Sequence, residues 1–136
     1  MAAIRIENEL IEYRAIKKGV RQGCVVPPDL FNLYSEMIMR NFNEHEGVKL
    51  GGNNVSNLSY ADDTVLIADS EEKLQTLLTT ATVKSIEKGI QLNSKKTECM
   101  VISNEANILI CNISCDDEKI KQVKILKYQG YTITQN

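Results

Sequence analysis

The sequence lacks an excess of basic residues. Its 136 residues include 16 Lys and Arg against 18 Asp and Glu, which gives a formal net charge of −2 at pH 7. Proteins that bind nucleic acid on their own usually carry a basic surface. The charge balance therefore argues against a complete nucleic-acid polymerase.

Long apolar runs and a secretory leader pattern are absent as well. No stretch approaches the roughly 20 apolar residues that a membrane-spanning helix needs, and the N-terminus lacks the basic and then apolar order of a signal peptide. Hydrophobic residues at 43% and charged residues at 25% are typical of a folded globular chain. We therefore expect one intracellular domain without membrane association.

The sequence also lacks the paired cysteine and histidine ligands of a zinc site. The only histidine is His45, and no CxxC pair occurs. Cys111 and Cys115 are close in sequence, but two further ligands at suitable spacing are missing, so zinc is the disfavoured alternative there. We expect reduced thiols, in the core or on the surface, at all four cysteines: Cys24, Cys99, Cys111 and Cys115.

The first third of the chain predicts a hairpin, a basic loop and a helix. Residues 2–16 alternate weakly around a polar break, as β-hairpins do, and residues 17–24 form a basic loop with two glycines. Pro27 and Pro28 then open a helix, because proline is tolerated in a first turn. Apolar residues at spacings of three and four form a stripe on this helix, which we expect to face the core: Leu30, Phe31, Leu33, Tyr34, Met37, Ile38 and Phe42.

Turn and capping residues divide the remainder into further elements. Gly47 and Gly51-Gly52 mark a turn between residues 48–50 and a strand beginning near Val55. Ser70 is a good N-cap for a helix that ends at Lys88-Gly89. Its inward face is predicted to hold Leu74, Leu77, Leu78 and Ala81, and later strands are expected at 99–102, 108–113 and 123–126, followed by 127–133. This order predicts an α+β fold, with two helices packed on one face of a mainly antiparallel sheet.

Two adjacent carboxylates, Asp62 and Asp63, stand between apolar runs within residues 58–68. Each run reads as a strand, so the segment predicts a hairpin with an acidic turn. Carboxylates beside apolar strands must be solvated, hydrogen-bonded or neutralised by a cation. A surface turn that uses Asp for its turn geometry is the simpler interpretation, and a divalent cation site is the alternative.

Several short motifs in a fixed order extend this pattern along nearly the whole chain. They are Gly19-Val20-Arg21-Gln22-Gly23-Cys24, Pro28 with Leu30-Phe31-Asn32, Tyr60-Ala61-Asp62-Asp63, Leu92-Asn93 with Lys96-Thr97-Glu98, and Lys127-Tyr128-Gln129-Gly130. Together they resemble the reverse transcriptases of non-LTR (LINE-type) retrotransposons. The resemblance implies that residues 1–136 are a single partial domain, the polymerase palm without the fingers, the first catalytic strand and most of the thumb.

The resemblance also implies roles for the acidic hairpin. Nucleotidyl transfer in this family uses two Mg²⁺ ions, with Mn²⁺ as a substitute, and hard oxygen ligands suit both metals. Asp62 would be a catalytic metal ligand, and Asp63 would bind less directly and reinforce the negative field. Tyr60 and Ala61 would lie beneath the primer end.

Other residues inherit binding roles from the same resemblance. Arg21, Gln22 and Gly23 would line the pocket for the incoming nucleotide, and Lys96 would neutralise or protonate the leaving pyrophosphate. Tyr128 and Gly130 would belong to the hairpin that grips the primer. The partners of the parent protein would be an RNA template, a DNA primer and dNTPs.

Departures from the family pattern limit these expectations. The family site uses a further aspartate from a strand that would precede residue 1, so we expect this chain alone to be inactive. Pro27 replaces a usual serine and Gln129 a usual aliphatic residue, which places an amide where packing is expected. The alternatives are a non-catalytic remnant that binds nucleic acid or protein weakly, and a small α+β domain whose acidic turn holds a structural cation.

Overall fold

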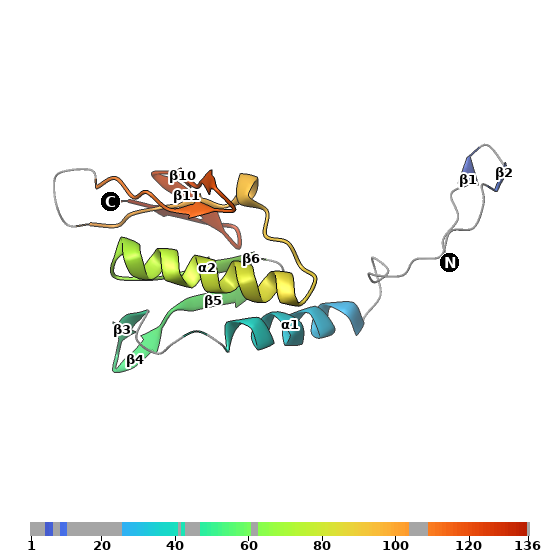
Figure 1. Cartoon of the computed structure of the whole chain (residues 1–136), viewed down its shortest axis with the longest axis horizontal. Helices are drawn as coiled ribbons and strands as arrows, with labels where there is room; N and C mark the ends of the chain where they lie inside the picture. The colour runs from blue at the N-terminus through green and yellow to red at the C-terminus, as the bar shows by residue number, and fades with distance from the viewer. Residues whose placement is uncertain are drawn as a thin grey trace.

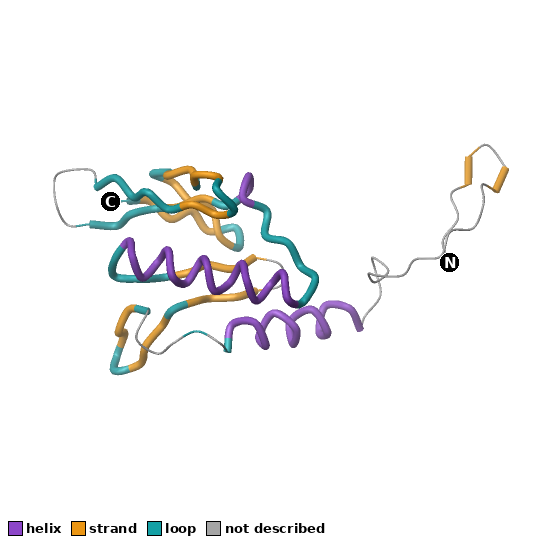
Figure 2. The backbone as a smooth tube through the Cα atoms, viewed as in Figure 1, coloured by secondary structure: helices purple, strands orange, loops and turns teal. Residues whose placement is uncertain are grey.

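A computed structural model describes residues 5–6, 9–10, 26–40, 42, 47–60, 63–103 and 109–135. Two helices and short paired strands make up this part of the chain (Figures 1 and 2). The predicted α+β class is confirmed. Most pairs of strands among the described residues are antiparallel, and they form small two-stranded sheets. No helix in the described part is long and apolar enough to cross a membrane.

The N-terminal hairpin is present in short form. Strands β1 (Arg5–Ile6) and β2 (Glu9–Leu10) pair antiparallel, with Ile6 opposite Glu9. Both strands lie within residues 2–16, where the sequence predicts a hairpin. The other residues of that range lie outside the part of the chain that the structure describes.

Helix α1 (Val26–Met39) begins one residue before the two prolines, which occupy its first turn as predicted. The prediction that the whole apolar stripe is buried is wrong. Ile38 is 4% exposed, whereas Leu33 and Met37 are 57% and 48% exposed. The side of the helix that carries Ser35 faces inward. Successive residues of an α-helix are about 100° apart, so Leu33 and Met37 lie about 160° around the axis from Ser35, on the opposite side.

Strands β3 (Val48–Leu50) and β4 (Asn53–Val55) form the predicted hairpin. Gly51 and Gly52 have φ values of 57° and 87°, and two-residue hairpin turns of this kind require positive φ at both central positions. Gly47, just before β3, is buried against the backbone of the opposite strand. A β-carbon there would overlap the Val55 carbonyl and lie 2.7 Å from the Ser56 nitrogen.

Replacing Gly47 with alanine should therefore lower the free energy of unfolding by about 1–3 kcal/mol, the usual cost of overpacking. The atoms in the way belong to the backbone and cannot swing aside. Urea unfolding followed by circular dichroism would measure the loss. Gly51→Asn in the same hairpin is the control and should change stability little, because asparagine tolerates positive φ. Equal stability of the Gly47 variant and the native chain would contradict the expectation.

Helix α2 (Glu71–Glu87) starts and ends where the capping residues predict. The Ser70 hydroxyl accepts a hydrogen bond from the Lys73 amide at 3.3 Å. At the other end Gly89 has φ 77°, and the Ile90 amide donates to the Ser85 carbonyl at 2.8 Å, which is the Schellman arrangement. The predicted inward face is confirmed: Leu77, Leu78 and Ala81 are buried and Leu74 is half-buried.

The C-terminal third follows α2 as a short 3₁₀ helix and six short strands. These are η1 (Ser94–Lys96), β7 (Glu98–Cys99), β8 (Ser114–Cys115), β9 (Glu118–Lys119), β10 (Lys121–Gln122), β11 (Ile125–Tyr128) and β12 (Tyr131–Thr134). Strand β10 pairs parallel with β7, and the pairs β8–β9 and β11–β12 are antiparallel. Helix α2 contacts α1, β6 (Asp63–Leu66) and β8, and so connects the two halves of this part of the chain.

The predicted strand positions in this third need correction. The strand expected at 99–102 ends at Cys99, and the one expected at 123–126 begins at Ile125. The described residues 109–113 form no strand, and side chains take two of their amides, although the Ile113 carbonyl accepts a hydrogen bond from the Ile120 amide. The Cys111 amide donates to the Gln122 side chain at 2.9 Å, and the Asn112 amide donates to Glu71 at 3.1 Å.

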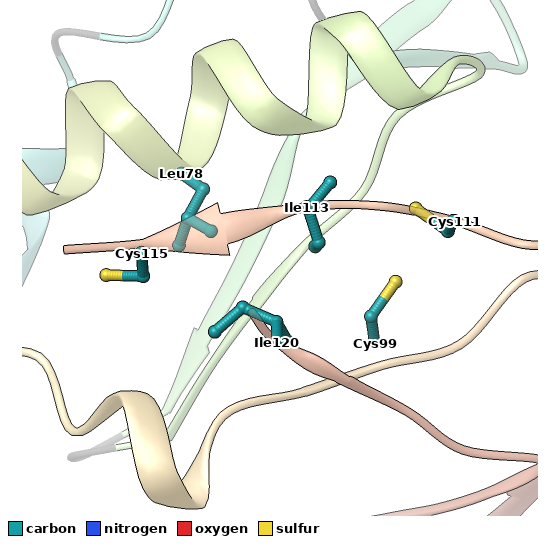
Figure 3. Close-up of a cluster of buried hydrophobic side chains, with 6 residues drawn as sticks. All are labelled: Leu78, Cys99, Cys111, Ile113, Cys115 and Ile120. Atoms are coloured by element: carbon teal, nitrogen blue, oxygen red, sulfur yellow. The ribbon is translucent and has the colours of Figure 1, made fainter. Parts of the chain in front are cut away.

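A buried cluster lies where α2 meets the C-terminal strands (Figure 3). Its members come from α2, β7, β8 and the segments next to β8 and β9: Leu78, Cys99, Cys111, Ile113, Cys115 and Ile120. All three described cysteines are free thiols in this core. Burial, and then the hydrogen bond with Cys111, raises the pKa of the Cys99 thiol from 9.0 to about 12. Cys99 is therefore a protonated packing group at neutral pH and not a nucleophile.

Candidate active site

The acidic hairpin is formed by β5 (Asn57–Tyr60) and β6 (Asp63–Leu66), as predicted. The strands are antiparallel, with Leu58 opposite Val65 and Tyr60 opposite Asp63. The last pair directly flanks positions 61 and 62. Ala61 and Asp62 themselves lie outside the described residues.

The two faces of this hairpin differ in what they contact. Paired residues of an antiparallel ladder share a face, so Ser59 and Thr64 lie on one face together with Leu66. This face meets both helices: α1 contacts β5, α2 contacts β6, and Leu66 packs against the core cluster. The hairpin thus fits the prediction of helices packed on one face.

The opposite face of the hairpin is exposed at its acidic end, whereas Val65 on this face is half-buried. Leu58 is 48% exposed and Tyr60 is 64% exposed, and the Asp63 carboxylate is exposed beside them. A surface with an aliphatic group, an aromatic ring and a carboxylate can contact a ligand that combines apolar rings with a cation or sugar. No rearrangement of the two helices is needed for a ligand to reach it.

The predicted nucleotide-pocket residues fall in two places. Arg21, Gln22 and Gly23 lie outside the described residues, a few positions before α1 begins at Val26. Lys96 ends η1 and is exposed, and its ammonium makes no ion pair with any described residue. The Asn93 side chain holds this turn by accepting a hydrogen bond from the Lys96 amide at 3.3 Å.

The predicted primer-contact residues Tyr128 and Gly130 belong to the hairpin β11–β12. Tyr128 pairs with Tyr131 across a two-residue turn in which Gln129 and Gly130 have φ values of 52° and 77°. Gln129 is exposed, so its amide meets solvent and not the packing that the sequence analysis expected. A β-carbon at Gly130 would meet no atom within 4 Å, which leaves its backbone open to close approach.

Sequence reasoning did not single out Tyr131, which is 77% exposed at the end of the same hairpin. Its position opposite Tyr128 follows from the two-residue turn of the hairpin that the family resemblance implied at residues 128–132. The two rings flank the turn in the same way that Tyr60 and Asp63 flank positions 61 and 62.

Carboxylates that could hold a metal are few in the described part. Residues 26–40, 47–60, 63–103 and 109–135 contain no group of three His, Cys, Asp or Glu side chains arranged for a metal ion. Asp63 is an exposed carboxylate next to a second one in sequence, Asp62. Paired carboxylates of this kind suit Mg²⁺ and Mn²⁺, which prefer oxygen ligands.

An acidic hairpin backed by two helices, with a basic, glycine-containing segment earlier in the sequence, fits a nucleotidyl-transfer enzyme. Comparison with known families agrees: residues 1–133 match the reverse transcriptase (RNA-dependent DNA polymerase) family. The chain belongs to this family, whose members generally use divalent metals and bind a nucleic-acid template and primer.

The similar proteins are polyproteins of retrotransposable elements. The chain is 32% identical over 116 residues to the Retrovirus-related Pol polyprotein from type-1 retrotransposable element R2 of Nasonia vitripennis, covering 85% of this chain and 10% of that protein. It is 38% identical over 80 residues to the type-2 element R2DM polyprotein of Drosophila melanogaster, covering 58% and 8%. The chain thus spans about a tenth of the length of these relatives.

Proposed function

We propose that this chain is part of the palm of an RNA-directed DNA polymerase from a non-LTR retrotransposon. The observation that carries the proposal is the register of β5 and β6, which pairs Tyr60 with Asp63 and flanks the dipeptide that contains Asp62. Support comes from the family match over residues 1–133 and from the R2 relatives.

In this proposal the acidic hairpin binds the catalytic cations. Asp62 is the principal ligand of Mg²⁺ or Mn²⁺, and the exposed Asp63 adds negative charge next to it. When bound, the two ions would activate the primer hydroxyl and hold the triphosphate. The open face of the hairpin leaves Tyr60 available to contact the primer end, together with Ala61.

The remaining predicted residues act on the other reactants. Arg21, Gln22 and Gly23 contact the incoming dNTP just before α1, and Lys96 offers an exposed ammonium to the pyrophosphate. Tyr128 and Gly130 contact the primer backbone, where the absence of a side chain on Gly130 permits close approach. The RNA template and DNA primer are the macromolecular partners.

A second candidate function, a non-catalytic remnant, is favoured by the net charge of −2. A chain with this charge has little electrostatic attraction for a duplex on its own. In that case the hairpin would bind a cation or a weak partner without supporting synthesis.

An exchange of segments tests the proposal. The matching segment of the Nasonia vitripennis R2 polyprotein is replaced with residues 1–133 of this chain, and primer extension on an RNA template is measured with Mg²⁺ and Mn²⁺. We expect the exchanged polyprotein to extend the primer, and the 136-residue polypeptide alone to give no extension.

The outcomes separate the two functions. An exchanged polyprotein that is folded and binds primer and template, yet gives no extension, would favour the remnant. Extension by the isolated polypeptide would contradict the expectation that it is inactive alone. The exchanged polyprotein carrying Asp62→Asn controls for contaminating polymerase.

A further inference from the structure

The contact between α1 and β5 is polar at its centre. The two elements lie side by side (Figures 1 and 2). Ser35 on α1 is 8% exposed, and its Oγ lies 3.0 Å from the Oγ of Ser59 on β5. The Ser59 hydroxyl also lies 3.3 Å from the Thr64 Oγ1 on β6. Three hydroxyls therefore run from the helix across both strands of the hairpin.

These hydroxyls stand close to the acidic end of the hairpin. Ser59 precedes Tyr60 directly, and Thr64 follows Asp63 directly. A contact between apolar side chains lets a strand slide by a fraction of an ångström, whereas a hydrogen bond fixes distance and direction. Of the three, only the Ser35 hydroxyl is buried, and it resists displacement because it loses its partner when it moves, whereas Ser59 and Thr64 are exposed.

We propose that Ser35 and Ser59 are positioning residues, and that their hydrogen bond holds the hairpin on α1 and so fixes the position of Asp63 at the end of β6, beside the turn to which the proposed function assigns a divalent cation. The inference rests on the proposed function for its cation, but the hold of α1 on the hairpin can be measured without one. Because α1 begins just after Arg21, Gln22 and Gly23, the same bond fixes the hairpin relative to the start of that helix.

Two variants of nearly equal shape isolate the hydroxyl. Ser59→Val removes it and Ser59→Thr keeps it, and valine and threonine are both favoured in strands. Ser59 is exposed, so the added methyl groups have room. Ser35→Ala removes the partner hydroxyl and improves helix propensity, which keeps the fold intact.

The main measurement is Mn²⁺ affinity of the 136-residue chain, followed by electron paramagnetic resonance of the free ion. Loss of one net hydrogen bond corresponds to a weakening of about twofold to tenfold. We expect this for Ser59→Val and for Ser35→Ala, no further loss when both are combined, and native affinity for Ser59→Thr. Thr76→Val removes an exposed hydroxyl of α2 that donates to the Glu72 carbonyl, and it should change nothing.

A second measurement needs no metal. Amide hydrogen exchange in β5 and β6 should quicken by a similar factor in Ser59→Val and Ser35→Ala, but not in Ser59→Thr, while exchange in β11 and β12 stays the same. Unchanged exchange at β5 and β6 would overturn the positioning role.

Together the two measurements distinguish a failure of the positioning role from a failure of the proposed metal site. If Asp62→Asn weakens Mn²⁺ binding strongly but Ser59→Val and Ser59→Thr bind alike, the positioning role is wrong and the metal site stands. If Asp62→Asn leaves Mn²⁺ binding unchanged, the proposed function loses its metal site, and hydrogen exchange alone decides whether the serine pair holds the hairpin.

Discussion

Ile120→Ala is expected to lower the free energy of unfolding by about 2–5 kcal/mol, the range measured for buried isoleucine truncations. Ile120 is 1% exposed at the end of the β8–β9 hairpin, within the buried cluster (Figure 3). Its amide donates to the Ile113 carbonyl at 2.9 Å, which ties the two segments together. Removal of three carbons there leaves a cavity that this backbone cannot close. Urea unfolding followed by circular dichroism measures the change.

Two controls keep this expectation falsifiable. Ile110→Ala truncates an isoleucine that is 73% exposed and should change stability by less than about 0.5 kcal/mol. Ile120→Val removes a single carbon and should lower the free energy of unfolding by about 0.5–1.5 kcal/mol. This smaller loss can be measured even if the alanine variant is already unfolded without urea. Equal losses for Ile110→Ala and Ile120→Ala would show that burial does not determine the cost.

Sequence predicted best those features that one or two residues determine locally. Ser70 caps α2 because its hydroxyl bonds an amide three residues on, and Gly89 ends the helix because it accepts positive φ. Gly51-Gly52 specify their turn for the same reason. The acidic hairpin was predictable because two apolar runs that read as strands flank a short acidic break.

Features that depend on distant partners were harder to predict. Residues 109–113 look like a strand, since Cys111, Ile113 and Cys115 alternate inward. Two amides there donate to side chains from β10 and α2, Cys111 to Gln122 at 2.9 Å and Asn112 to Glu71 at 3.1 Å. Periodicity shows which side chains are buried, but it does not show what binds the backbone.

The orientation of α1 was missed for a related reason. Its stripe of apolar residues covers a wide arc, and the pattern does not say which part of that arc meets the hairpin. Ser35 is polar and was not a candidate for the core, yet it is 8% exposed and its Oγ lies 3.0 Å from that of Ser59. Leu33 and Met37 are exposed because they lie on the opposite side of the helix from Ser35.

Asp62→Asn should weaken Mn²⁺ binding to the 136-residue chain by about 30-fold. The substitution keeps the shape of the side chain and removes one charge. A unit charge about 4 Å from a divalent ion in water contributes about 2 kcal/mol, which corresponds to that factor. Asp63→Asn should have a smaller effect, because this residue belongs to β6 and is expected to bind less directly. Electron paramagnetic resonance of free Mn²⁺ gives both affinities.

The chain offers an internal control for this experiment, since Asp116 and Asp117 form a second pair of adjacent acids in a two-residue hairpin turn. Their φ values of 50° and 63° suit asparagine as well as aspartate, so Asn variants should fold normally. If a turn with two carboxylates were enough to bind the cation, Asp117→Asn would weaken binding as much as Asp62→Asn. We expect no effect at Asp117, because the proposed function places the cation at the β5–β6 turn and not at the β8–β9 turn. Equal effects at the two turns would reduce the site to nonspecific attraction between charges and would remove the basis for a catalytic hairpin.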